Sequence, residues 1–343
     1  MDFNYEFYKK TAYELFNINS PSGYHIEVNS YLKDKLHSLG YTYKESNKGN
    51  IEVFIKGKSN KKVLATSAHT DTLGLMVRSI NANGTLSITK VGGPQIPTFD
   101  GEYCTIQTRN NKKYSGTILC NSSSSHVYPD AKKERDETNM IIRIDEAVKN
   151  ANDVRALGIN NGDYVFIEPK FTILDNGFIK SRFLDDKASA VMLLTLLKAF
   201  KEQEVILPYD TYFYFVNYEE VGHGASTVSD DITEFVTVDM GCVGLDLAGN
   251  EYAVSIACKD SGGPYDYELT TRLLNLALAN NIDYALDIFP FYGSDIGAAY
   301  RAGRDFKGAL IGQGVDASHG MERTHIKGIV NTYKLLYAYL TTA

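Results

Sequence analysis

The most constraining feature of this chain is the point where a run of apolar and aromatic residues ends in two adjacent carboxylates. Residues 211–218 have the pattern of a buried strand, Glu219 and Glu220 follow, and a glycine-rich turn comes next. Burying two like charges side by side is costly unless a cation lies beside them. The stretch therefore predicts a polar site at the end of a central strand.

Three other segments carry side chains of the kinds that bind metal ions in proteins. They are residues 67–71, 183–187 and 316–319. Together with the glutamate pair, these segments supply imidazole and carboxylate groups and no thiolate. That combination suits a hydrolytic metal centre.

The first of these segments contains His69 and Asp71, directly after an apolar strand. Side chains two residues apart in an extended segment point to the same side. We therefore expect Asp71 to accept the second ring N–H of His69 and to orient the imidazole as a metal ligand. A solvated turn is the ordinary alternative for an isolated pair of this kind.

The second segment contains Asp185 and Asp186, which follow the strand-like run 178–184 and precede a helix that Lys187 opens. Helix capping explains one acidic residue at this place. It explains two carboxylates directly after a strand less well. A rigid site of this kind suits a carboxylate that bridges two cations.

Glu219 and Glu220 are expected to have different tasks, because adjacent residues of a strand point to opposite sides. One of them can bind metal while the other faces the substrate as a general base. An exposed pair at a sheet edge is the alternative. The aromatic run 212–216 favours a central strand instead.

Asp239 and His319 complete the set of candidate ligands. Asp239 ends the apolar run 235–238, where a turn aspartate before a glycine is the simpler interpretation. His319 precedes the last helix, and His325 is close by, so one of the two histidines can instead begin the helix or support the site. The chain order His, Asp, Glu, Asp, His nevertheless favours one shared site.

Composition is that of a soluble globular protein and excludes several classes of partner. Hydrophobic residues make up 43% of the chain and charged residues 22%, which permits a large core. The net charge of -7 offers no basic surface to nucleic acid. We find neither a run of about 18 apolar residues nor a signal-peptide pattern, so no membrane partner is expected. The four scattered cysteines are typical of free thiols in a cytoplasmic protein.

The pattern of elements predicts an α/β fold. Apolar residues at helical spacing indicate helices over 5–16, 24–39, 187–202, 265–280, 294–302 and 326–341. Strands are expected at 51–56, 63–68, 211–218, 235–240, 253–259, 285–290 and 308–312. This alternation implies a mixed, mostly parallel sheet that is sandwiched by helices.

Residues 73–165 differ from the rest of the chain. Short strands alternate there with Gly and Asn turns, and helical periodicity is scarce before residue 145. This indicates a small inserted all-β domain, either a barrel or a PDZ-like module. We therefore expect a discontinuous α/β domain over residues 1–72 and 166–343, which carries all the candidate ligands.

The ordered motifs HTD, LDDK, EEVGHGA, VDM and SHGMERTH resemble those of the tetrahedral (TET-type) aminopeptidase family. This family is related to the glutamyl and leucyl aminopeptidases that use two co-catalytic metals. The stretches SPSGYHIEV, LGLMVRSI and ALGINNGDYV also match, so the resemblance spans nearly the whole chain. It implies the α/β fold of co-catalytic metallopeptidases, with a PDZ-like dimerisation domain as the insertion.

The resemblance also implies a centre of two divalent ions, with zinc or cobalt expected first, and the nitrogen and oxygen ligands do not exclude manganese. The implied ligands are His69 and Asp239 for one ion, Glu220 and His319 for the other, and Asp185 between them. Glu219 is implied as the general base and Asp71 as the carboxylate behind His69. The expected reaction is the removal of N-terminal residues from peptides by an activated water, in a homo-oligomer that is a dimer or a dodecamer.

The chain departs from the family pattern at Thr72, at His223 and directly after His319. These departures leave the ligand set intact but leave the substrate open. Glu322 and Arg323 can pair with each other on the surface or contact substrate. Two alternative functions therefore stay open: a dimetal amidohydrolase or deacylase acting on small acylated amino compounds, and a non-catalytic peptide-binding or assembly protein.

Overall fold

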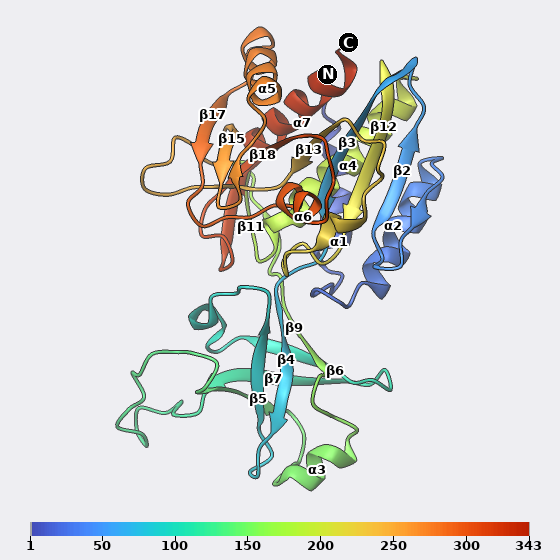
Figure 1. The fold of residues 1–343 in the computed structure, drawn as a ribbon. Helices are drawn as coiled ribbons and strands as arrows, with labels where there is room; N and C mark the ends of the chain where they lie inside the picture. Colours follow the sequence, from blue (N-terminus) through green and yellow to red (C-terminus); the bar gives the residue numbers. More distant parts are fainter. Residues whose placement is uncertain (1, 343) are drawn as a thin grey trace. The chain divides into compact units, whose positions relative to one another are not determined.

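The computed structural model describes residues 2–342, which form two compact units. One unit, called here the α/β unit, comprises Met1–Asp71 and Lys170–Ala343, and the other, the barrel unit, comprises Thr72–Pro169. Figure 1 shows the elements in chain order. The second boundary comes later than residue 166 because strand β9 (Tyr164–Ile167) belongs to the barrel unit.

The α/β unit is built on a 10-stranded sheet. Its strands are β1 (Lys44–Glu45), β2 (Ile51–Ile55), β3 (Ser59–His69), β12 (Tyr209–Val216), β13 (Glu234–Val238), β14 (Gly241–Cys242), β15 (Val254–Asp260), β16 (Gly263–Pro264), β17 (Tyr284–Ile288) and β18 (Lys307–Val315). The order is β1-β2-β12-β3-β13-β18-β15-β16, with β14 beside β18 and β17 beside β15. Strands β12, β3, β13 and β18 run parallel to one another at the centre, which confirms the predicted mixed sheet.

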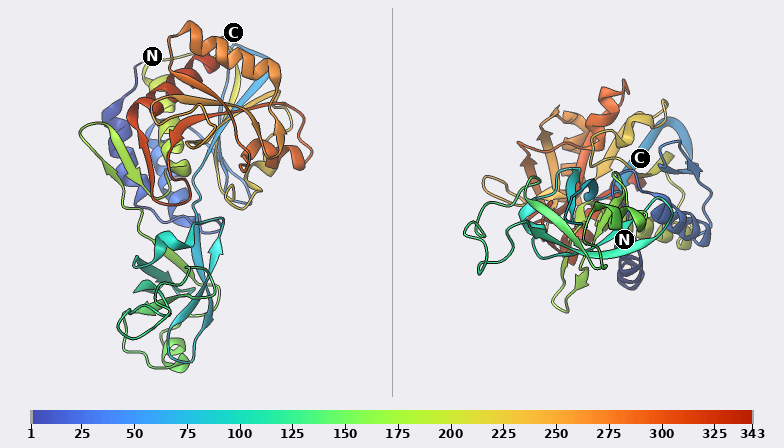
Figure 2. Two further views of the ribbon diagram at one scale, coloured as in Figure 1. Left: turned by 90° about the vertical axis from the view of Figure 1, so that its left-hand side faces the viewer. Right: turned by 90° about the horizontal axis from the view of Figure 1, so that it is seen from below.

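Side chains that alternate along the central strands pack into two separate cores. In β13, for example, Val236 and Val238 join one core and Phe235 joins the other. The first core is covered by α1 (Tyr5–Phe16), α2 (Ile26–Ser38), α4 (Leu184–Glu202), α5 (Tyr267–Ala279) and α7 (Ile326–Thr341). The second is covered by α6 (Asp295–Arg301) and the 3-10 helix η2 (Gly224–Thr227). The left view of Figure 2 shows helices on both sides of this sheet.

Helix α4 is apolar and buried on nearly all sides, as befits a helix at the centre of the unit. It begins at Leu184, before the expected residue 187, and its first turn is irregular. Asp185 and Asp186 have non-helical backbone angles there, and the peptide bond between them is cis. Both candidate carboxylates therefore lie at the start of a buried helix, as their position in the sequence suggests.

A small second sheet in the α/β unit is not foreseen from the sequence. It consists of β10 (Thr172–Ile173), β11 (Phe178–Ser181) and β19 (Glu322–His325), in that order. Strands β11 and β19 are antiparallel, and their register pairs Ser181 with Glu322. This pairing brings the segment before α4 next to the segment that follows His319.

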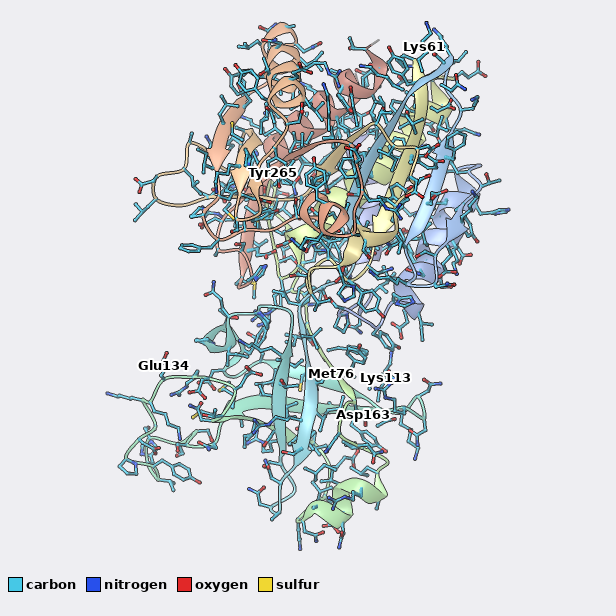
Figure 3. The ribbon with its side chains drawn as sticks, in the orientation of Figure 1. Lys61, Met76, Lys113, Glu134, Asp163 and Tyr265 are labelled. Atoms are coloured by element: carbon cyan, nitrogen blue, oxygen red, sulfur yellow. The ribbon has the colours of Figure 1, made fainter. Side chains whose placement is uncertain are left out.

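The barrel unit is a closed barrel in the order β4-β5-β8-β7-β6-β9. Besides β9, the barrel strands are β4 (Gly74–Ile80), β5 (Leu86–Val91), β6 (Tyr103–Gln107), β7 (Lys113–Cys120) and β8 (Met140–Ile144). The unit also contains the 3-10 helix η1 (Ile96–Phe99) and helix α3 (Ala151–Ala156). Figure 3 marks Met76 on β4 and Asp163 just before β9. Oδ2 of Asp163 accepts the N–H of Asn160 at 2.8 Å and fixes the turn that leads into β9. Closure gives each barrel strand two partners, so these strands present no open edge.

Expectations from the sequence about the cysteines and about membrane-spanning segments can also be compared with the structure. All four cysteines are free: Cys104 and Cys120 are buried in the barrel unit, and Cys242 and Cys258 are partly exposed in the α/β unit. Among residues 2–342, no helix has the length and apolar character needed to cross a membrane.

Candidate metal centre

His69 ends strand β3, and its side chain is only 1% exposed. Its Nδ1 lies 2.9 Å from the backbone carbonyl oxygen of Asp71. A carbonyl oxygen can only accept, so Nδ1 carries a proton and donates it there. Nε2 lies 2.9 Å from Oδ1 of Asp185. Because a neutral Nε2 and a carboxylate oxygen are both acceptors, this contact needs a proton or a cation between the two atoms.

Asp71 differs from its expected arrangement. The sequence predicts its carboxylate behind the His69 ring, but Oδ1 lies 3.6 Å from Nδ1, beyond hydrogen-bond distance. The carboxylate instead accepts the backbone N–H groups of Glu219 and Glu220, at 3.1 and 3.3 Å, and the hydroxyl of Ser22. Asp71 thus orients the imidazole through its backbone carbonyl and the glutamate pair through its side chain.

The glutamate pair lies in a turn and not on the strand. Strand β12 ends at Val216, and Tyr218 has a left-handed φ of 66° that redirects the chain. The expected reason for the two glutamates to face apart, strand alternation, is therefore wrong. The turn produces their divergence, and the carboxylate of Asp71 holds the turn.

Both glutamate side chains lie near the His69 imidazole, and that of Glu220 also lies near His319. Oε2 of Glu219 lies 3.8 Å from Nε2 of His69, and Oε2 of Glu220 lies 3.6 Å from Nε2 of His319. The Glu220 side chain is 3% exposed and that of Glu219 is 14% exposed. Glu219 is therefore the more accessible of the pair.

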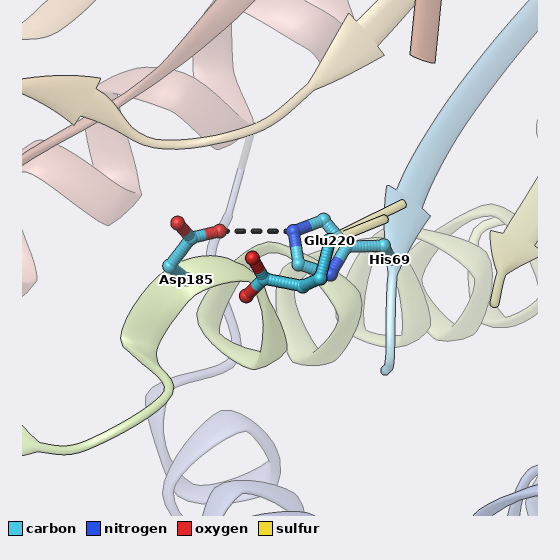
Figure 4. A group of neighbouring side chains, drawn as sticks. All are labelled: His69, Asp185 and Glu220. Atoms are coloured by element: carbon cyan, nitrogen blue, oxygen red, sulfur yellow. Dashed lines mark hydrogen bonds and ion pairs between the residues drawn. The ribbon is translucent and has the colours of Figure 1, made fainter. Parts of the chain in front are cut away.

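Asp185 lies between the same two imidazoles. Its Oδ1 is 2.9 Å from Nε2 of His69, and its Oδ2 is 3.5 Å from Nε2 of His319. Figure 4 shows His69, Asp185 and Glu220, with a dashed line for the first of these contacts. A carboxylate that directs one oxygen toward each imidazole has the arrangement of a bridge between two sites.

Ligand atoms converge in two overlapping groups. His69, Asp185 and Glu220 place one ligand atom each within 4.8 Å of one another, and so do His69, Asp186 and Asp239. The sequence prediction names Asp186 beside Asp185 but does not include it among the ligands, whereas here it lies near His69 and Asp239. Asp239 is buried, and its Oδ1 accepts the N–H of Met240 at 2.6 Å.

The electrostatics of the cluster indicate a surplus of buried negative charge. Burial, reinforced by the charge of Asp185, raises the pKa of Glu220 well above its ordinary value and that of Asp239 to about 8. For Asp185, burial acts to raise the pKa, but hydrogen bonds from His319 and His69 lower it below the ordinary value. Among residues 2–342, the buried Oε1 of Glu220 has no hydrogen-bond partner. Crowded acids with an unpaired oxygen and an all-nitrogen-and-oxygen donor set fit divalent cations.

A cavity of about 240 Å³ adjoins the cluster, and its lining includes Asp185, Glu219, Glu220, Asp239 and His319. It is also lined by Phe291 and Arg301. The Phe291 side chain is 97% exposed, and Arg301 donates to the carbonyl oxygen of Gly222 at 3.1 Å. The cavity thus adjoins both the carboxylates and the surface, as a substrate site must.

Comparison with protein-family models matches residues 49–335 to the M42 glutamyl aminopeptidases. The chain belongs to the M42 glutamyl aminopeptidase family. It is accordingly a metal-dependent aminopeptidase, a hydrolase, which confirms the class that the motifs imply. The residues matched include every candidate ligand.

Known proteins are similar to this M42 chain in sequence or in fold. The Bacillus subtilis (strain 168) protein YhfE, provisionally named an aminopeptidase, is 44% identical over 329 residues, which are 95% of each chain. A crystal structure of a TET aminopeptidase from the marine sediment archaeon Thaumarchaeota archaeon SCGC AB-539-E09 superposes with a TM-score of 0.88. That structure is 20% identical and covers 97% of this chain and 96% of its own. The Pyrococcus horikoshii TET1 peptidase has a TM-score of 0.85 at 20% identity, over 98% of this chain and 100% of its own.

The M42 chain also shows what becomes of the residues that the sequence left open. Arg323 pairs with Glu251, to which its Nε and Nη2 donate at 2.6 and 3.0 Å, and not with Glu322. Arg323 is also not among the residues that line the cavity. His325 caps helix α7 by accepting the N–H of Lys327 at 3.0 Å. His223 stacks on Tyr218, with ring centroids 5.1 Å apart.

For Glu322, sequence reasoning considers a surface pair or a substrate contact and misses its buried position beside two candidate ligands. It is 2% exposed, and its two oxygens accept the backbone N–H groups of Asp185 and His319, at 3.1 and 3.0 Å. Its sequence neighbours, Met321 and Arg323, are surface residues, and nothing local marks Glu322 as buried. The only available signal is its place three residues after a candidate ligand.

Proposed function

We propose that this aminopeptidase holds two divalent cations between the strand ends and the loops of the α/β unit. The proposed ligands are His69 and Asp239 for one ion, Glu220 and His319 for the other, and Asp185 for both. The observation that carries the proposal is the position of Asp185, with one carboxylate oxygen toward each imidazole. Asp186 is a further candidate ligand beside Asp239.

Divalent cations at such a centre acidify water and polarise the scissile carbonyl. Glu219 then acts as the general base: its carboxylate takes a proton from the attacking water and delivers it to the leaving amine. It faces the cavity, and burial together with the charge of Asp239 raises its pKa well above the ordinary value. Asp71 positions Glu219 through the backbone N–H that it accepts.

The substrate proposed for the cavity is a peptide with a free N-terminal amine. Among the lining carboxylates, Glu219 is the one that the proposal leaves free of metal, and its negative charge attracts an ammonium group. An amidohydrolase acting on small acylated compounds needs the same metals but a cavity that accepts a blocked amine. The two functions therefore differ in a way that a substrate panel can resolve.

The test is to assay EDTA-treated enzyme, before and after adding Zn²⁺, Co²⁺ or Mn²⁺, against aminoacyl p-nitroanilides and N-acetyl amino acids. The proposal predicts no activity after EDTA, recovery with metal, and turnover of the substrates with a free amine only. Preferential hydrolysis of the N-acetyl compounds would contradict the exopeptidase assignment. The metal that restores the highest kcat/KM identifies the preferred cation.

We also propose a homo-oligomer, with a dimer and a dodecamer as the alternatives. The P. horikoshii TET1 peptidase assembles into a tetrahedron or a large octahedral shell. Dimerisation through the barrel unit and a cytoplasmic location stay predictions. Size-exclusion chromatography with light scattering measures the mass of the assembly, which can be compared with the 38.1 kDa of one chain. A single species of one chain would contradict the proposal.

A further inference from the structure

Glu322 joins two distant parts of the metal centre through their backbones. Strand β19 begins with this residue, and its pairing with Ser181 of β11 places it beside the start of α4. Oε2 accepts the N–H of Asp185, and Oε1 accepts the N–H of His319. One buried carboxylate thus contacts two segments that lie 137 and 3 residues away in the sequence.

Neither of these segments is fixed by regular secondary structure. Asp185 has φ -74° and ψ 103°, outside the helical region, although it lies in the first turn of α4. His319 has a left-handed φ of 63°, as does Ala317 with a φ of 56°. Residues other than glycine adopt this region at a cost, and they stay there only when other contacts hold them. The contact with Glu322 is one that holds His319 there.

The two backbone groups belong to the residues whose side chains must act together. Asp185 directs one oxygen to His69 and the other to His319. A shift of the Asp185 backbone relative to that of His319 therefore changes the distances on both sides of the centre. Ligands of a metal are oriented by such outer contacts, and loss of one typically weakens metal binding.

We propose that Glu322 is a positioning residue of the dimetal centre, and the inference rests on the function proposed above. Its carboxylate keeps the Asp185 and His319 backbones at a fixed separation, so that both side chains face the cations at once. A carboxylate that served the fold alone would be a poor choice here. It is 2% exposed, and burying a charged group costs more free energy than burying an apolar side chain of similar size.

The deciding variant is Glu322→Gln. The side chain keeps its size, but its amide nitrogen faces one of the two backbone N–H groups and cannot accept from it. Arg323→Gln is the matched control, because it changes the adjacent residue and loses the contacts of the guanidinium with Glu251 and with the Phe178 ring, neither of which is a candidate ligand. Each purified variant is stripped with EDTA and titrated with Zn²⁺ by calorimetry, and its melting temperature is measured with and without Zn²⁺.

We expect Glu322→Gln to raise the Zn²⁺ dissociation constant by about 10–100-fold. The melting temperature of the stripped protein should fall because one buried N–H loses its acceptor, and the rise produced by Zn²⁺ should also be smaller than in the wild type. With saturating metal, kcat falls and KM stays close to the wild-type value. Arg323→Gln should match the wild type in Zn²⁺ affinity and in kcat.

A purely structural role gives a different result. In that case Glu322→Gln lowers the melting temperature of stripped and metal-loaded protein equally, with unchanged Zn²⁺ affinity, and the inference is overturned. If Glu322→Gln does not fold, Glu322→Asp decides by the same measurements. It keeps the charge but is one methylene shorter, so it can reach only one N–H, and an intermediate loss of Zn²⁺ affinity is expected. A wild-type chain that binds no Zn²⁺ refutes the proposed dimetal function itself, whatever the variants show.

Discussion

The two sides of the candidate metal centre are built in different ways. On one side, which we call the strand side, His69 is the last residue of β3, and Asp239 directly follows β13. These two strands are parallel neighbours in the sheet, and the His69 side chain is 1% exposed. On the other, the loop side, Glu220 and His319 lie in irregular segments, and the His319 side chain is 34% exposed. Asp185 contacts both imidazoles from the start of α4.

The difference shows two ways in which a fold can place a ligand. The strand side is positioned by the ladder of the central sheet, whose geometry follows from the core around it. The loop side depends on side chains that accept backbone N–H groups, Asp71 for the glutamate turn and Glu322 for His319. We therefore expect the strand side to tolerate little change and the loop side to be adjustable through residues outside the ligand set.

The largest effect is expected from Asp185→Ala, because this residue serves both sides. The variant should retain no bound metal and no activity above background, while Asp305→Ala, which removes an exposed aspartate, leaves both unchanged. Metal content by plasma mass spectrometry and circular dichroism on the same samples check this. Two equivalents of metal in the Asp185→Ala protein would contradict the bridge.

The glutamate pair sharpens the comparison, since its members differ by one position in the sequence. Glu219→Gln should keep the metal content of the wild type and lose about 10²–10⁴-fold in kcat, because only proton transfer is removed. Glu220→Gln should instead lose metal on the loop side. Metal analysis with steady-state kinetics distinguishes the two, and a Glu219→Gln enzyme with a tenth of the normal kcat would exclude Glu219 as the base.

A smaller but more selective contrast is expected from His69→Ala and His319→Ala in the presence of added imidazole. Because the His319 side chain is partly exposed, free imidazole can enter the space left by its removal and restore part of the activity. The His69 side chain is buried, and its space is not open to solvent. Activity measured against imidazole concentration checks this, and equal rescue of both variants would remove the distinction between the two sides.

The smallest effect is expected from His325→Ala, which concerns the other histidine of the same motif. Loss of the cap on α7 should cost about 1 kcal/mol of stability and leave metal content and kcat unchanged. His325→Asn, which keeps a capping acceptor, should recover the capping part of the loss but not the ring contacts with Phe178 and Tyr252. Calorimetric melting of the three proteins gives the comparison, and a loss of metal from His325→Ala would place this histidine in the centre after all.

Much of this architecture could be predicted because it is encoded locally. Apolar periodicity located the long helices and the central strands, and the five candidate ligands follow strand or loop ends that are visible in the sequence. The strand side in particular needed only the observation that His69 and Asp239 lie where strands end. The family resemblance then supplied roles that no local pattern contains.

What could not be predicted depends on contacts between distant segments. The pairing of β19 with β11 buries Glu322 beside Asp185, and no property of residues 318–325 alone reveals it. The left-handed Tyr218 moves the glutamate pair off the strand, so strand alternation does not apply to it. The role of Asp71 changed because its partners, Glu219 and Glu220, are 148 and 149 residues away in the sequence.

The most direct test of the account is anomalous X-ray scattering at the zinc edge from crystals grown with Zn²⁺. The account predicts two peaks in each chain, one against His69 and Asp239 and one against Glu220 and His319, with the Asp185 carboxylate between them. A single peak, or a pair of peaks that Asp185 does not separate, would contradict a centre shared by the strand side and the loop side.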